Sequence, residues 1–189
     1  MDQNNHDITR ILSEAAAGQQ QASEELLPLV YEELRRLAAA RMAQEASGHT
    51  LQATALVHEA WVRLTGGTEQ KWANRAHFFS SASEAMRRIL IESARRKARI
   101  KRGGDLVRME LEDLDLAAAS PDEMVLLVDD ALARFKQEDP EKAKIVVMKF
   151  FGGLTSQEVA DTLGVTERTV ERQWAYAKAW LFRDIQKET

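Results

Sequence analysis

The sequence contains no cysteine and no long hydrophobic run, and both absences restrict what the protein can be. Without cysteine, neither a disulfide framework nor a thiolate metal site can form. No apolar stretch approaches the roughly 20 residues that a helix needs to cross a bilayer, and residues 1–10 are polar. The 189 residues are 44% hydrophobic, which is enough to bury a core. We therefore expect a soluble, cytoplasmic protein with no membrane span.

Histidine is also scarce, and its spacing does not suit a metal site. The four histidines are scattered along the chain. His58 and Glu59 could begin a zinc-protease helix, but Val62 occupies the position of the second histidine ligand. Residues 103–105, Gly-Gly-Asp, lack the lysine and the hydroxyl residue of a phosphate-binding loop. No catalytic constellation is visible, so we expect no enzymatic activity, no metal ion and no cofactor.

Charges of the two signs are unevenly distributed. The chain has 30 acidic and 26 basic residues, and its net charge of −4 is unfavourable for binding nucleic acid. Residues 71–102, however, contain ten Lys or Arg against two acids, whereas residues 103–141 contain twelve acids against three bases. This pattern predicts a basic surface in one part of the protein, weak binding of the free protein to DNA, and a partner that completes the binding surface.

Apolar residues recur at helical spacing along almost the whole chain, and no β-type alternation is apparent. We predict an all-α fold with two helical domains, 1–102 and 122–189, joined by a flexible acidic linker, 103–121. The clearest apolar stripe consists of Phe78, Ala82, Ala85, Ile89 and Ser93. Ahead of the last two helices, the expected helices cover residues 8–18, 27–41, 55–64, 74–99, 122–135 and 140–151.

The C-terminal part of the chain contains the signals of a helix-turn-helix at the required spacing. Thr155 and Glu158, three residues apart, form a capping box for the first helix. Gly164 supplies the permissive backbone at the end of that helix, and we expect Val165 to fill the space between the two helices. Thr166 is placed to cap the second helix.

The second helix of this motif has two distinct sides on a helical wheel. Its predicted buried side consists of Val170, Trp174, Ala177 and Leu181. Its predicted outward side consists of Arg168, Arg172, Ala175 and Ala179, flanked by Glu171 and Tyr176. An outward face that is small at its centre and polar at its edges suits a helix in a major groove, so DNA recognition is the leading hypothesis. The alternative is that two ordinary surface helices carry solvated arginines.

Three segments follow one another in a particular order: ALVHEAWVRL at 55–64, AMRRILIESARRK at 85–97, and the helix-turn-helix at 154–181. In this order, residues 26–185 resemble the extracytoplasmic-function (ECF) sigma factors of bacterial RNA polymerase. Those proteins consist of two helical domains joined by a flexible linker. The amino-acid sequences of these segments are typical of a divergent subgroup, because His58 stands where Gln is usual and Arg88 where Asn is common.

The resemblance implies three sets of binding residues. The segment 55–64 is similar to the helix that binds the polymerase clamp, and its candidates for core polymerase binding are His58, Glu59 and Trp61. The segment 85–97 is similar to the one that engages the −10 element, and the candidates for −10 binding and melting are Trp72, His77, Arg87, Arg88, Arg95 and Arg96. The segment 154–181 is similar to the −35-binding domain, with the candidates Arg168, Thr169, Glu171, Arg172, Ala175 and Tyr176.

Each candidate also has a plainer interpretation. Trp72, His77, Phe78 and Phe79 come just before the basic segment and are candidates for holding unstacked bases. Phe78, however, lies on the apolar stripe and is expected in the core. The arginines could form a solvated face. Glu59 could pair with Arg63, four residues further on.

The resemblance implies a sigma factor that binds core RNA polymerase and directs promoter recognition, DNA melting and transcription initiation at a specific set of promoters. Its partners would be core RNA polymerase and promoter DNA, and in the family an anti-sigma factor often sequesters the protein. The alternative is a stand-alone helix-turn-helix transcriptional regulator. Such a regulator has no need for the 55–64 helix beside a basic melting segment.

Overall fold

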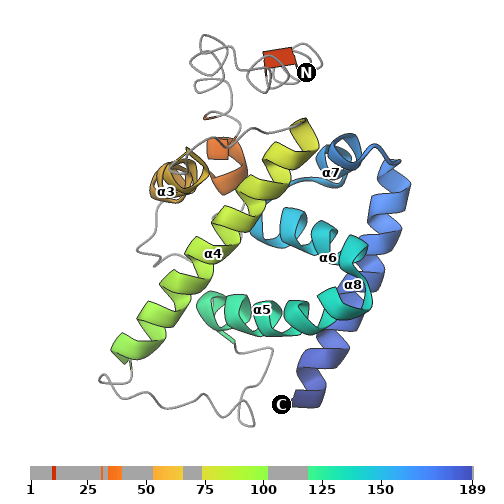
Figure 1. Cartoon of the computed structure of the whole chain (residues 1–189). Helices are drawn as coiled ribbons and strands as arrows, with labels where there is room; N and C mark the ends of the chain where they lie inside the picture. The colour runs from red at the N-terminus through yellow and green to blue at the C-terminus, as the bar shows by residue number, and fades with distance from the viewer. Residues whose placement is uncertain are drawn as a thin grey trace.

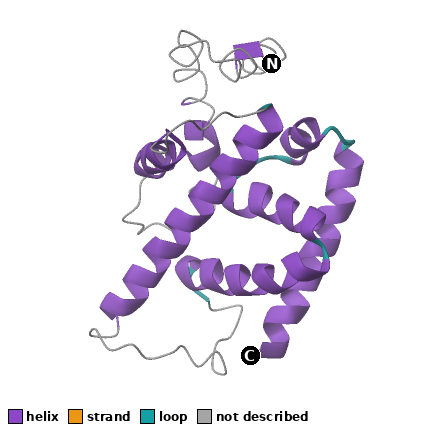
Figure 2. Cartoon of the chain, in the orientation of Figure 1, coloured by secondary structure: helices purple, strands orange, loops and turns teal. Residues whose placement is uncertain are grey.

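A computed structural model describes residues 10–11, 31, 34–39, 53–65, 74–101 and 119–188. Within these ranges every regular element is a helix and there is no strand, so the predicted all-α fold is confirmed (Figure 2). The elements are α3 (Ala53–Thr65), α4 (Arg75–Lys101), α5 (Pro121–Glu138), α6 (Pro140–Val146), the π-helix η2 (Val147–Phe151), α7 (Ser156–Leu163) and α8 (Glu167–Glu188).

The predicted helices 55–64, 74–99 and 122–135 correspond to α3, α4 and α5, each longer in the structure than in the prediction. Most of the predicted helices 8–18 and 27–41, and most of the predicted linker 103–121, lie outside the described residues. Residues 34–39 are helical, as expected, and bury Leu34, Leu37 and Ala38.

Helix α4 lies at the centre of the fold, with α3 on one side and α5, α6 and η2 on the other (Figure 1). It begins after Asn74, whose side-chain oxygen accepts the backbone N–H of His77 at 2.8 Å and so caps the helix. All members of the predicted apolar stripe are buried. Phe78 and Phe79 are both buried and meet edge to face, with ring centroids 5.2 Å apart. Neither ring is therefore available on the surface for base stacking, and the core interpretation of Phe78 is confirmed.

Helices α5, α6, α7 and α8 form a second unit around Phe135, Val146 and Phe151, all of which are fully buried. Trp180 of α8 packs against Phe135, with ring centroids 4.8 Å apart, and its indole N–H donates to Glu138 at 3.0 Å. Strong caps start both α5 and α6. Ser120 and Glu123 form a capping box, and Asp139 caps α6 directly before Pro140. Asp139 alone lies at the turn between the two helices, where its backbone N–H also ends α5 by donating to Phe135.

The segment 140–151 was predicted as a single helix, but its last turns widen into the π-helix η2. The backbone N–H of Gly152 donates to Val147 at 2.9 Å, a span of five residues. Gly152 then lies against α4, where a Cβ atom at this position would be only 2.3 Å from the Ser83 hydroxyl oxygen. Only a residue without a side chain fits there. The units predicted at 1–102 and 122–189 are thus packed against each other, and their buried residues form one continuous core.

Candidate nucleic-acid interface

The helix-turn-helix consists of α7 and α8, and its local signals form the predicted hydrogen bonds. The Thr155 hydroxyl accepts the N–H of Glu158 at 3.2 Å, and the Glu158 carboxylate accepts the N–H of Thr155 at 2.8 Å. Gly164 has φ +68°, the left-handed conformation that favours glycine. The Thr166 hydroxyl accepts the N–H of Thr169 at 3.2 Å. The capping box, the turn glycine and the second cap are therefore confirmed.

One expectation about the turn is wrong. Val165 was expected to fill the space between the two helices, but its side chain is 42% exposed. Its backbone N–H closes the turn instead, donating to Ala160 at 3.1 Å. The space between α7 and α8 is filled by Val159 and Val170, which are fully buried. The left-handed Gly164 directs the chain so that the side chain of the next residue points towards solvent.

The two sides of α8 are as predicted. Val170, Ala177 and Leu181 are buried and Trp174 is half-buried. All residues predicted for the outward side are exposed: Arg168, Glu171, Arg172, Ala175, Tyr176 and Ala179. Thr169 is half-buried, and its hydroxyl lies 2.8 Å from that of Thr166. Thr169 is therefore engaged in the cap of α8, while its neighbours Arg168 and Arg172 project from the helix.

Tyr176 is 53% exposed but does not extend freely into solvent. Its ring centroid lies 6.4 Å from that of Phe135, and the Lys142 ammonium lies 5.2 Å from the centre of the Tyr176 ring. Contacts with α5 and α6 therefore hold this side chain at the edge of the outward face.

Lys149 of η2 contacts both helices of the helix-turn-helix, and no sequence signal indicated this role. Its ammonium donates to the Ser156 hydroxyl at 3.1 Å and lies 5.8 Å from the centre of the Trp174 ring. Burial is the largest influence on the pKa of Lys149 and lowers it, although nearby Glu158 and Glu171 act in the opposite direction. Lys149 thus connects η2 to the start of α7 and to the inner side of α8.

The predicted −10 residues of α4 differ in accessibility. Arg88 and Arg95 have side chains 67% and 64% exposed, and Arg96 and His77 are also exposed. Arg87 has a side chain only 20% exposed and pairs with Asp129 of α5 and with Glu84. The structure thus presents Arg88, Arg95 and Arg96 to solvent and directs Arg87 towards α5. Trp72 lies outside the described residues.

The predicted polymerase-binding residues lie on α3. His58 is exposed, Glu59 is partly exposed, and Trp61 is half-buried against the core. Glu59 accepts from Arg63 at 2.7 Å, which confirms the expected pairing within the helix.

The Arg63 guanidinium also spans both oxygens of Glu92 on α4, at 3.0 and 2.5 Å. The hydrogen bond with Glu92 raises the pKa of Arg63, and the hydrogen bond with Arg63 lowers the pKa of Glu92. This network fixes α3 against α4. The spacing of residues in the sequence indicated the pair between Arg63 and Glu59, but not the pair between Arg63 and Glu92.

Within the part of the chain that the structure describes, no three His, Asp or Glu side chains gather as metal ligands would. None of the described helices is long and apolar enough to span a membrane.

Comparison with known proteins is informative at the level of the family. In comparisons with curated proteins and with solved structures, nothing matches the chain. The sequence model of the family described as "ECF sigma factor" matches residues 5–187, nearly the whole chain. The match includes α3, α4 and the helix-turn-helix. Members of this family are transcription factors that act in transcription initiation rather than enzymes. The chain therefore belongs to the ECF sigma factor family.

Proposed function

We propose that the protein binds core RNA polymerase in the bacterial cytoplasm and directs promoter recognition, DNA melting and transcription initiation at a specific set of promoters. The observation that carries this proposal is that one chain combines α3, packed against the basic helix α4, with the exposed basic face of α8. Helix α8 is capped at Thr166, is anchored by the fully buried Val170, and projects Arg168 and Arg172 into solvent. One side of α8 is held by the core, and the other side is exposed and basic near its N-terminal end, which suits a helix that enters the major groove.

Within the −35 element, we assign the reading of bases chiefly to Arg172. A bidentate contact from arginine to guanine contributes about 1–3 kcal/mol of discrimination. Ala175, one turn further along the same exposed side, is small enough for the helix to approach the base edges. Glu171 would accept from a cytosine amino group, while Thr169 positions the start of the helix and Tyr176 lines its edge.

On α4, the exposed arginines Arg88, Arg95 and Arg96 would neutralise backbone phosphates at the −10 element. Melting also requires that unstacked bases be captured, and stacking on an aromatic ring contributes about 1–3 kcal/mol per base. We assign this role to His77, at the exposed start of α4, and to Trp72. Arg87 would join them only after leaving Asp129.

On α3, the exposed His58 and the partly exposed Glu59 would contact the polymerase clamp, and Trp61 would hold the helix to the core. Because Arg63 already pairs with Glu59 and Glu92, the network keeps α3 rigid against α4 before polymerase binds. A rigid contact surface loses less conformational entropy on binding.

The direct test is run-off transcription from genomic DNA fragments with core RNA polymerase, with and without the protein. We expect discrete new transcripts that core enzyme alone does not make, with a shared sequence motif upstream of their starts. If the protein binds duplex DNA but neither binds core enzyme nor yields transcripts, it is a stand-alone regulator and the proposal is wrong.

A matched pair of variants tests the assignment of α8. Arg172→Ala should change which −35 sequences are preferred, whereas Arg183→Ala, an exposed arginine near the other end of the same helix, should leave the preference unchanged. A loss that is uniform over all sequences would reassign Arg172 to the phosphate backbone.

A further inference from the structure

Two of the predicted −10 residues of α4, Arg87 and Arg95, lie beside an acidic residue of α5. Asp129 of α5 is 7% exposed, and its Oδ1 atom accepts from the Arg87 guanidinium, with Nε at 2.8 Å. Its other oxygen lies 3.9 Å from the guanidinium of Arg95. Further along both helices, the Lys97 ammonium lies 2.9 and 3.1 Å from the two carboxylate oxygens of Asp122. We refer to Arg87, Lys97, Asp122 and Asp129 as the α4–α5 clasp.

Two more contacts join the same two units. The guanidinium of Arg87 lies 5.9 Å from the centre of the Phe151 ring, so α4, α5 and η2 together enclose this side chain. In the helical segment 34–39, Arg36 pairs with Glu158 of the helix-turn-helix. Together with the contact between Arg95 and Asp129, four ion pairs thus connect basic residues of the N-terminal unit to acidic residues of the C-terminal unit.

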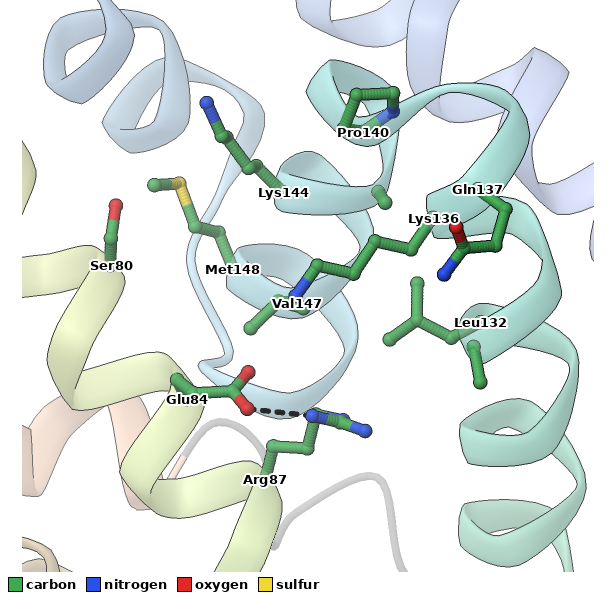
Figure 3. A pocket seen from close by; sticks show the side chains of 12 residues that line it. Ser80, Glu84, Arg87, Leu132, Lys136, Gln137, Pro140, Lys144, Val147 and Met148 are labelled. Atoms are coloured by element: carbon green, nitrogen blue, oxygen red, sulfur yellow. Dashed lines mark hydrogen bonds and ion pairs between the residues drawn. The ribbon is translucent and has the colours of Figure 1, made fainter.

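The junction between the units is not packed throughout. A pocket of about 380 Å³ opens beside Arg87. In Figure 3, Ser80, Glu84 and Arg87 of α4 form one wall of this pocket, and Leu132 of α5 and Met148 of η2 lie across from them. Side chains along this pocket are not packed against the opposite unit, so separating the units there exposes less apolar surface than separating a continuous interface would.

The clasp and a promoter phosphate would compete for the same side chain. Arg87 cannot pair with Asp129 and with a promoter phosphate at once, and Asp129 places a carboxylate near Arg95 where phosphate would otherwise lie. We propose that in the free protein Asp129 of α5 holds Arg87 and lies beside Arg95, so that it covers this part of the promoter-binding side of α4 and keeps the chain closed until polymerase and promoter separate the two helices. This inference rests on the proposed function, because it assigns a regulatory state to the same site.

The absence of cysteine makes the closed state directly measurable. Ile100→Cys, at a side chain 75% exposed on α4, and Arg183→Cys, at an exposed position on α8, allow two spin labels to report the distance between the units. The distance distribution would be recorded for the full-length chain, for Asp129→Asn, and for Lys97→Gln. Glu141→Gln serves as the control, since it removes the same charge from a carboxylate that pairs with Lys144 within α6.

In the parent chain we expect one narrow distance, which lengthens when core RNA polymerase is added. Asp129→Asn should broaden the distribution and raise the ratio of open to closed chains at least about tenfold, because breaking a buried ion pair has a larger effect than breaking an exposed one. Lys97→Gln should have a smaller effect, and Glu141→Gln none. A broad distribution in the parent chain would overturn the proposal. So would narrow, unchanged distributions in both clasp variants.

Circular dichroism checks that each variant keeps its helices. If Asp129→Asn does not, the outer pair of the clasp decides through Lys97→Gln and Asp122→Asn, because broadened distances in both variants support the clasp and unchanged narrow distances refute it. Transcription separates this inference from the proposed function. If Asp129→Asn opens the chain but the protein never binds polymerase, the inference of a closed state stands and the proposed sigma function is wrong. Transcription by a chain that stays closed on polymerase would refute the inference alone.

Discussion

The turn of the helix-turn-helix allows a sharp prediction for Gly164→Ala. Gly164 has φ +68°, and a Cβ atom built there meets nothing within 4 Å. The substitution therefore introduces no collision, and its whole effect is conformational. An L-residue in the left-handed region costs about 1–2 kcal/mol. The smaller conformational entropy of the unfolded chain offsets about 0.4–1 kcal/mol of that, so we expect a net destabilisation of about 1 kcal/mol.

For a chain of this size, that change corresponds to a fall in Tm of about 2–4 °C. Thermal and urea unfolding, followed by the helical circular dichroism signal, would measure it. Gly164→Asn is the matched variant, because asparagine adopts the left-handed conformation more readily than alanine. It should recover most of the lost stability while adding a larger side chain to the same open space. If the alanine variant is as stable as the parent, or if asparagine destabilises more than alanine, the reasoning about this turn is wrong.

Three further predictions follow from the core, the ion pairs and the basic helix. Phe151→Ala should destabilise the protein by about 3–5 kcal/mol, because the ring is fully buried; urea unfolding measures this, and a loss below about 1 kcal/mol would contradict the packing. Since Arg63 lowers the pKa of Glu92 below its ordinary 4.5, the contribution of Glu92 to stability is complete above that pH and is lost as the pH falls through the lowered value. Glu92→Gln should therefore lose stability at pH 7 but less so near pH 3, and an equal loss at both would refute the pairing. Arg95→Gln should weaken promoter complexes alike for all sequences and reduce the salt slope by about 1, whereas an unchanged slope would remove Arg95 from the phosphate contacts.

The features that could be predicted from the sequence depend on residues close together in the chain. A capping box needs two side chains three residues apart, and the left-handed glycine needs only its own missing Cβ. Thr155, Glu158, Gly164 and Thr166 therefore all act as predicted. The same holds for the two sides of α8, because the helical repeat alone assigns residues to opposite faces.

The departures from prediction arise where the neighbour of a residue comes from elsewhere in the fold. Helical periodicity does not distinguish an α-helix from a π-helix, so the sequence did not predict η2. The close approach of Gly152 to Ser83 was also not predicted, because the two residues are far apart in the chain. Val165 is apolar, but the direction of the chain after Gly164 leaves it exposed. An apolar residue in a turn is buried only if a partner lies opposite, and one sequence does not specify that partner.

The sequence by itself therefore determined helices α3, α4 and α5, the caps of the helix-turn-helix, the two sides of α8 and the family to which the chain belongs. Only the tertiary structure decided which charged side chains remain accessible. Arg87 and Asp129 are 42 residues apart in the chain, and nothing in the local pattern distinguishes Arg87 from its exposed neighbour Arg88. Adjacent residues on a helix point in directions about 100° apart. What each one meets depends on the helix that packs there, and that packing is decided by the burial of apolar surface over the whole chain.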